Sequence, residues 1–166
     1  MVIIYKSNTG YTEQYARLLS QALNMPAYSA DNIPSAHKGK DVIFLGWLMA
    51  GSIMGYKKVA GYCRVRCAVG VGMGPPTPEL VPGFRSKLGI PADTAVFYLQ
   101  GGFDLSRLRG PFRLIMEVKV KDIAAKLQAK PELDEAERAT LAMTREGHSC
   151  VCEENLAEII AWAKSN

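Results

Sequence analysis

The chain has 166 residues, a length that fits one globular domain and leaves little for a second. With 48% hydrophobic residues, 22% charged residues, a net charge of +4 and a mean hydropathy of zero, it is not an intrinsically disordered chain. The longest uncharged run, between Asp41 and Lys57, is too short for a bilayer-spanning helix. We therefore expect a single domain over residues 1–166, no transmembrane segment and, without a signal-peptide pattern, a cytoplasmic location.

Short β-rich runs alternate with helical patterns along the chain. Continuous apolar runs at 2–5, 42–45, 66–71 and 95–99 predict buried strands, and 26–29 is a further strand candidate. Apolar residues at helical spacing predict helices in four segments: 12–23, 107–130, 134–145 and 156–163. Strands that alternate with helices favour βαβ units, and hence a parallel sheet covered on both faces.

The positive charge is concentrated in one predicted helix. Residues 107–130 contain two acidic residues and seven basic ones: Arg107, Arg109, Arg113, Lys119, Lys121, Lys126 and Lys130. Such a stretch is typical of a solvated helix face, and it also suits docking to an acidic partner or an anionic membrane surface. Nucleic acid is disfavoured because Phe112 is the segment's one aromatic residue and no binding motif is present.

The loop after the first strand is rich in small hydrogen-bonding side chains and leads straight into a helix. It consists of Ser7, Asn8, Thr9, Gly10, Tyr11 and Thr12. Hydroxyl groups and backbone N–H groups at a helix N-terminus can bind phosphate oxygens, although the same pattern also serves as an ordinary helix cap. No lysine lies in the loop, so a nucleotide triphosphatase loop is not supported.

Residues 3–19 show a spacing that resembles the flavodoxin signature: Ile-Ile-Tyr-x-Ser-x-x-Gly-x-Thr-x-x-x-Ala-x-x-Leu. Within it, Ser7-x-Thr9-Gly10-x-Thr12 is similar to the loop that holds the FMN phosphate in that family. The resemblance implies a flavodoxin-like α/β fold with an open parallel five-stranded sheet of order 2-1-3-4-5 and helices on both faces. It also implies FMN as the cofactor, bound by the loops after strands one, three and four.

The segment that follows the third predicted strand, residues 46–52, is similar to a second flavodoxin loop. Its candidate flavin-contacting residues are Trp47, Leu48, Met49, Ala50 and Gly51. The Trp47 indole is a natural stacking partner for a flat ring, unless it is simply a core residue. The resemblance gives Gly51 the peptide that reorients when the flavin is reduced, because glycine tolerates both conformations.

The segment after the fourth predicted strand, residues 70–77, is the third predicted cofactor loop. Its Gly-x-Gly-x-Gly pattern runs into two prolines instead of a helix, which excludes a dinucleotide fingerprint. Backbone amides of Gly72, Met73 and Gly74 are expected to face the flavin pyrimidine edge. The aromatic residue that shuttle flavodoxins usually offer here is missing, so Met73 covers the second ring face or leaves it to a partner or substrate.

The last strand is followed by Gly101-Gly102-x-Asp104 and then by the basic segment. This combination resembles flavodoxin-type domains related to bacterial protoporphyrinogen oxidases.

No arrangement of cysteine, histidine or carboxylate residues indicates a catalytic group or a metal site. The four cysteines, at positions 63, 67, 150 and 152, have spacings that suit reduced structural thiols better than a zinc or redox pair. His148 lies near the last two, but no fourth metal ligand is evident. Any redox chemistry is therefore expected to belong to a cofactor.

Three functions are consistent with these patterns. The first is an FMN-binding redox protein that exchanges electrons with a partner protein or a small-molecule acceptor. Because the chain is not acidic, its last reduction step should lie at a less negative potential than in acidic flavodoxins. The alternatives are a flavin-dependent oxidoreductase acting on a porphyrinogen or quinone, and a cofactor-free interaction module of the same fold.

Overall fold

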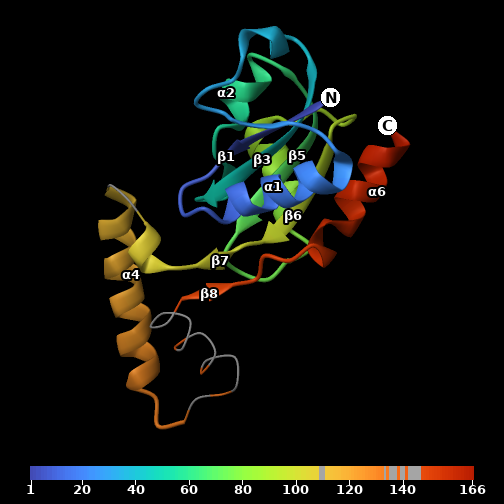
Figure 1. The fold of residues 1–166 in the computed structure, drawn as a ribbon. Helices are drawn as coiled ribbons and strands as arrows, with labels where there is room; N and C mark the ends of the chain where they lie inside the picture. The colour runs from blue at the N-terminus through green and yellow to red at the C-terminus, as the bar shows by residue number, and fades with distance from the viewer. Residues whose placement is uncertain (109–110, 133, 135–137, 139–140, 142–146) are drawn as a thin grey trace.

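The computed structural model covers residues 1–166 and describes all of them except 109–110, 133, 135–137, 139–140 and 142–146. At its centre is a sheet of five parallel strands: β1 (Val2–Lys6), β2 (Ala27–Ser29), β3 (Asp41–Met49), β5 (Arg64–Gly72) and β6 (Ala95–Gln100). They lie in the order β2-β1-β3-β5-β6 (Figure 1). In chain order of the parallel strands this is 2-1-3-4-5, which confirms the predicted fold class.

The central strands are apolar throughout because both faces of the sheet are covered. Ile3 and Ile4 of β1 are neighbours in sequence and point to opposite faces, yet both are fully buried. Ile43 and Phe44 of β3 show the same pattern. Continuous burial of this kind is typical of a parallel sheet between two helical layers.

One face of the sheet is covered by α1 (Tyr11–Leu23) and α6 (Ala157–Ser165). Tyr15 and Leu19 lie one turn apart on α1 and are fully buried against the sheet. Ile159 of α6 belongs to the same hydrophobic cluster. Both helices were predicted, from the patterns at 12–23 and 156–163. The predicted and observed ends differ by at most one residue, except that α6 continues two residues beyond 163.

The other face is covered by α2 (Tyr56–Ala60) and α3 (Leu80–Leu88), so helices lie on both faces as predicted. Val59 and Phe84 are the buried anchors of these two helices and pack in one cluster with Phe44. Neither helix was predicted. A short 3-10 turn, η1 (Ser35–His37), lies between β2 and β3.

A long excursion separates β6 from α6. It is closed by a two-residue antiparallel pairing of β7 (Gly102–Phe103) with β8 (His148–Ser149), and we call residues 102–149 the β7–β8 excursion. It contains η2 (Leu105–Arg107) and α4 (Pro111–Gln128), and η3 (Glu154–Leu156) follows it. Figure 1 shows α4 beside the sheet layers rather than on them.

The observed α4 confirms most of the helix predicted over 107–130, whereas the helix predicted over 134–145 lies largely outside the described residues. Within the described part of the chain, no helix combines the length and the apolar character needed to cross a membrane.

Candidate functional site

The carboxyl ends of the parallel strands meet at one edge of the sheet. The registers place Lys6, Gly46, Gly70 and Tyr98 in one row across β1, β3, β5 and β6. The chain leaves β1 toward β2 and returns to β3 on the opposite side of β1, so the strand order reverses between β1 and β3. Open α/β sheets bind ligands at such a reversal, outside the carboxyl ends of the strands.

The loop between β1 and α1 lies directly at this reversal. Gly10 adopts a φ of 93°, in the left-handed region where glycine is least strained. Its N–H group donates to Ser7 Oγ over 3.1 Å, which closes the turn. No described side chain caps the start of α1. The first amides of the helix therefore keep their capacity to bind an anion.

Two polar side chains of this segment are enclosed, and one of them has a donor without a hydrogen-bond partner. Asn8 Nδ2 is buried and meets no acceptor among the described residues. Thr12 is also enclosed, with 2% of its surface exposed. A buried donor without an acceptor costs on the order of 1–3 kcal/mol. Such donors fit a segment whose acceptor oxygens are supplied by a ligand.

β3 extends three residues beyond the row in which β1 ends. Trp47, Leu48 and Met49 belong to the strand, and Trp47 lies opposite Val71 of β5. The prediction of a loop over 46–52 is therefore wrong for these residues. The reason is that β5 pairs with this end of β3 on one side while a short strand folds back on the other.

The returning strand is β4 (Ser52–Ile53), which pairs antiparallel with the end of β3. Ala50 and Gly51 form the two-residue connection with φ values of 47° and 70°. Two successive positive φ angles define the hairpin turn that matches strand twist. The Ala50 carbonyl also accepts a hydrogen bond from Lys87 Nζ of α3.

Trp47 stands at the carboxyl edge and is half-buried. It points to the same face of β3 as Ile43 and Leu45, since side chains alternate along a strand. Its carbonyl accepts the Met54 N–H over 2.9 Å. The indole is therefore not a fully buried core group.

The predicted loop over 70–77 begins later than expected, because Gly70 and Gly72 lie inside β5. Gly72 pairs with β6, and a Cβ at this position would lie 2.7 Å from Tyr98 Oη. Close packing of the Tyr98 side chain against position 72 thus explains why this residue is a glycine. The loop itself starts at Met73.

Side chains of β6 hold the first carbonyls of this loop. The Tyr98 hydroxyl donates to the Gly74 carbonyl, and Gln100 Nε2 donates to the Met73 carbonyl over 3.1 Å. Burial raises the pKa of Tyr98 to about 12, so its hydroxyl keeps its proton at neutral pH. The Met73 side chain is 44% exposed and is therefore open to a ligand or partner.

The β7–β8 excursion begins against the first residue of α1. A Cβ at Gly102 would lie 3.0 Å from the Tyr11 ring and 2.2 Å from the His148 carbonyl oxygen. The Arg107 guanidinium carbon lies 5.7 Å from the Tyr11 ring centroid, within cation–π range. Burial raises the pKa of Tyr11, and the Arg107 charge opposes that shift.

Arg107 thus places a positive charge beside the start of α1. Sequence reasoning did not assign Arg107 to the site. The available signal was the basic segment directly after the predicted turn at 100–105. What the sequence did not indicate is that this segment returns to residue 11.

Tyr15 connects the end of β6 to the segment that follows the β7–β8 excursion. Its hydroxyl donates to the Gln100 carbonyl over 2.7 Å and accepts from Asn155 Nδ2 over 2.8 Å. The Cys150 N–H donates to the Gly101 carbonyl over 2.7 Å. The end of β6 and the segment that follows the β7–β8 excursion are therefore joined by hydrogen bonds.

The cysteines are free thiols in two environments. Cys63 and Cys67 are buried, and burial raises the pKa of both; Cys150 and Cys152 are half-buried beside the excursion. Among the described residues, no cluster of histidine, cysteine and carboxylate side chains is arranged to hold a metal ion.

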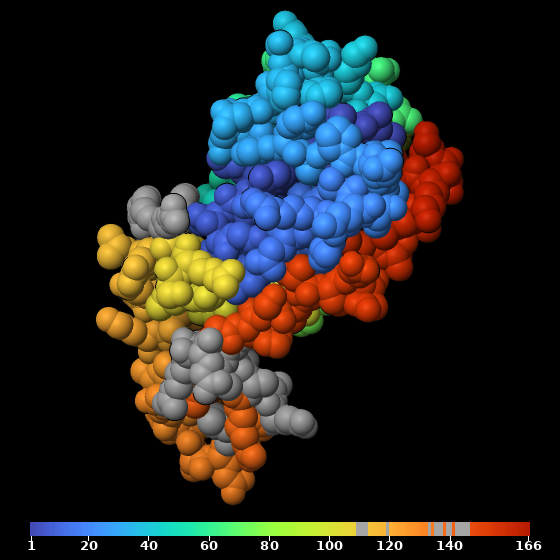
Figure 2. Space-filling model, viewed as in Figure 1, coloured from blue at the N-terminus to red at the C-terminus, as the bar shows by residue number. Residues whose placement is uncertain are grey.

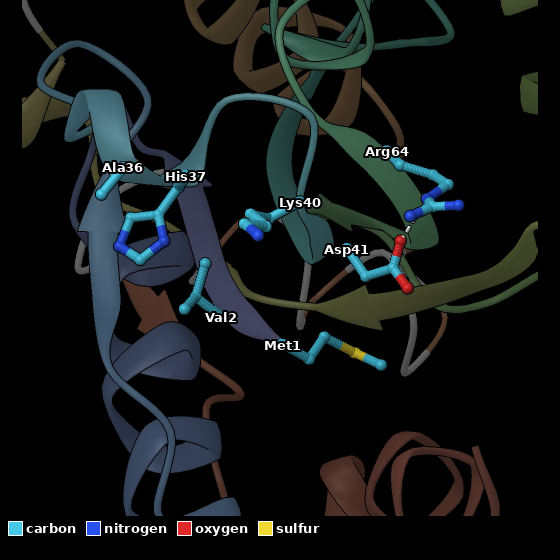
Figure 3. Close-up of a pocket in the computed structure, with 7 residues that line it drawn as sticks. All are labelled: Met1, Val2, Ala36, His37, Lys40, Asp41 and Arg64. Atoms are coloured by element: carbon cyan, nitrogen blue, oxygen red, sulfur yellow. Dashed lines mark ion pairs between the residues drawn. The ribbon is translucent and has the colours of Figure 1, made fainter.

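A surface hollow of about 510 Å³ lies at the opposite, amino-terminal edge of the sheet (Figure 3). The residues that line it include the ion-paired Asp41 and Arg64, and the others are Met1, Val2, Ala36, His37 and Lys40. None of the predicted site residues contributes to this hollow, so the two edges are separate candidate positions for a ligand.

Comparison with known proteins gave one structural likeness. A solved structure described as a flavodoxin from the domain Archaea has a TM-score of 0.38 and 10% sequence identity, covering 87% of this chain and 96% of the other. No family model matches the chain. No curated protein matches it either.

Proposed function

We propose that this chain is an FMN-binding redox protein whose phosphate site is the loop from Ser7 to Thr12. The observation that carries the proposal is the buried, unpartnered Asn8 Nδ2 beside the uncapped N-terminus of α1. The loop lies where the strand order reverses, which is the general ligand position of open α/β sheets.

The side chains present fit a phosphate monoester. Asn8 Nδ2 is an enclosed donor without a partner, Thr12 is a buried residue that carries a hydroxyl, and Thr9 between them in sequence is half-buried. The helix amides after Gly10 add donors and a favourable dipole. Trp47 would lie against the ring, and Gly51, Met73 and their neighbours would border it. FMN would supply the capacity for reversible electron transfer.

The electrostatic setting differs from that of an acidic electron shuttle. The chain carries a net charge of +4, and Arg107, which is paired with Asp104, stands beside the start of α1. Positive potential stabilises a negatively charged reduced cofactor. We therefore expect the last reduction step to occur at a less negative potential than in acidic flavodoxins, with a partner protein or a small molecule as the electron acceptor.

A flavin-dependent oxidoreductase acting on a quinone or porphyrinogen is the second candidate. The exposed Met73 side chain favours it, because no aromatic residue of this loop covers the second ring position. Turnover with a panel of quinones and porphyrinogens distinguishes this activity from simple electron exchange with a reductase.

The proposal is tested by titrating the protein with FMN and with riboflavin, which lacks the phosphate, and following quenching of flavin fluorescence. FMN should bind more tightly than riboflavin. The Thr12→Val variant should lose about 1–3 kcal/mol of FMN affinity, the range for a hydrogen bond to a charged group, without loss of protein stability. Ser86→Ala, an exposed hydroxyl deletion on α3, is the control. Equal affinity for the two flavins would contradict the phosphate site, and absence of binding to either would favour a cofactor-free module.

A further inference from the structure

The helix α4 presents aliphatic side chains to solvent. The most exposed large apolar side chains in the described chain are Val118, Leu114 and Ile115, with 69%, 67% and 54% of their surface accessible. Figure 2 shows this part of the chain, in orange, projecting from the rest of the molecule. Scattered exposed apolar residues are ordinary, whereas neighbouring ones form a patch that marks a contact surface.

The three side chains lie together on one side of the helix. At about 100° per residue, Val118 lies about 40° and Ile115 about 100° around the axis from Leu114. They span a little more than one turn near the start of α4. We call Leu114, Ile115 and Val118 the apolar stripe.

Lysine side chains lie near both edges of the apolar stripe. By the same geometry Lys121 lies about 20° outside one edge, and Lys126 lies about 20° outside the other, about two turns further along the helix. Asp122 lies within the sector of the stripe, about 80° from Leu114. The described carboxylates of α4 already have partners: Glu117 pairs with Arg113 over 2.8 Å, and Asp122 pairs with Lys126 over 2.8 Å. Lys121 is exposed and has no ion pair within the described chain.

We propose that α4 is an interfacial helix that lays the apolar stripe onto an anionic lipid surface. Short aliphatic side chains flanked by lysines suit the boundary between headgroups and acyl chains, where the stripe is buried and the ammonium groups meet lipid phosphates. Residues 107–130 carry seven basic and two acidic residues, so the charge of the whole segment matches an anionic surface.

This chemistry distinguishes lipid from the other possible occupants. Binding to an acidic protein would account for the basic side chains but not for the exposed aliphatic side chains between them. A second copy of the chain would bring the lysines that flank both stripes close to one another, which is repulsive. A lipid surface satisfies both features at once.

The test is co-sedimentation of the full-length chain with two kinds of vesicle, one of phosphatidylcholine alone and one of equal parts phosphatidylcholine and phosphatidylserine. The chain should sediment with the anionic vesicles, and raising the salt concentration should weaken binding because the charges are exposed. Val118→Asp should weaken it by at least about tenfold, since it removes an apolar contact and adds a repulsive charge.

Two matched controls add the same charges on α6. Ala161→Asp is the control for Val118→Asp, and Lys164→Glu is the control for Lys121→Glu. Both controls lie at exposed positions of α6 and should leave vesicle binding unchanged. Lys121→Glu should reduce vesicle binding on the order of tenfold. Light scattering without vesicles measures self-association. Absence of sedimentation, equal binding to neutral vesicles, or a dimer that Val118→Asp abolishes would each overturn the proposal.

Discussion

The guanidinium group of Arg107 lies over the ring of Tyr11, 5.7 Å from its centroid, and so connects η2 to the first turn of α1. The same Arg107 pairs with Asp104 over 3.0 Å, so both ends of η2 are fixed. Through this contact, a segment that follows the last strand of the sheet becomes a neighbour of the loop that follows the first.

Removing the Arg107 side chain should destabilise the fold modestly. Exposed cation–π contacts contribute about 0.5–1 kcal/mol, so Arg107→Ala should lower the free energy of unfolding in urea by that amount. Arg107→Lys should retain part of it because the charge remains. Lys164→Ala, at an exposed position of α6, is the control. If Arg107→Ala and the control behave alike, the contact with Tyr11 has no energetic role.

Adding a side chain at Gly102 should open the β7–β8 pairing. A Cβ there would lie 2.2 Å from the His148 carbonyl oxygen, a separation that only movement of the backbone relieves. In Gly102→Ala, the Cys150 amide, which donates to Gly101, should exchange its hydrogen faster than in the wild type. Gly74→Ala is the comparison, because no atom lies within 4 Å of its Cβ. Unchanged exchange at Cys150 in Gly102→Ala would contradict the close approach.

Two Gly→Ala substitutions should change stability in opposite directions. Gly51 has a φ of 70° in the β3–β4 turn, so Gly51→Ala should lower the free energy of unfolding by about 1–2 kcal/mol. Gly83 lies within α3 with open space around it, and Gly83→Ala should raise that free energy by about 0.5–1 kcal/mol through helix propensity. Thermal or urea unfolding measures both. A stabilising Gly51→Ala would exclude the observed turn.

Alkaline pH should weaken the fold through Tyr98. Burial raises its folded-state pKa to about 12 from the ordinary value of 10.0, so the unfolded chain releases this proton first. The stabilising contribution is complete below the unfolded pKa and is lost as pH rises from about 10 through about 12. Tyr98→Phe loses the hydrogen bond to Gly74, about 1 kcal/mol, at neutral pH. Its deficit should shrink across that pH window; a constant deficit would contradict the raised pKa.

The sheet was predictable because its strands carry a strong local signal. The runs at 2–5, 42–45, 66–71 and 95–99 are apolar without interruption, and burial on both faces produces that pattern. The strand order came from the resemblance over residues 3–19, not from the runs themselves. The topology confirms it.

What could not be predicted depends on contacts between distant residues. α3 contains Pro82 and Gly83, both poor helix formers, and its formation rests on burial of Phe84. The extension of β3 beyond Gly46 depends on pairing partners in β4 and β5. The position of Arg107 over residue 11 follows from a pairing of two short strands that lie far apart in sequence.

The most direct test of the FMN site is a map of backbone amide shifts in the isotope-labelled chain as FMN is added. The proposed site predicts that the largest changes fall on Asn8, Thr9, Gly10 and the following amides of α1, and that riboflavin without its phosphate leaves these amides nearly unchanged. Changes centred instead on the hollow lined by Lys40 and its neighbours, at the opposite edge of the sheet, would contradict the proposed site.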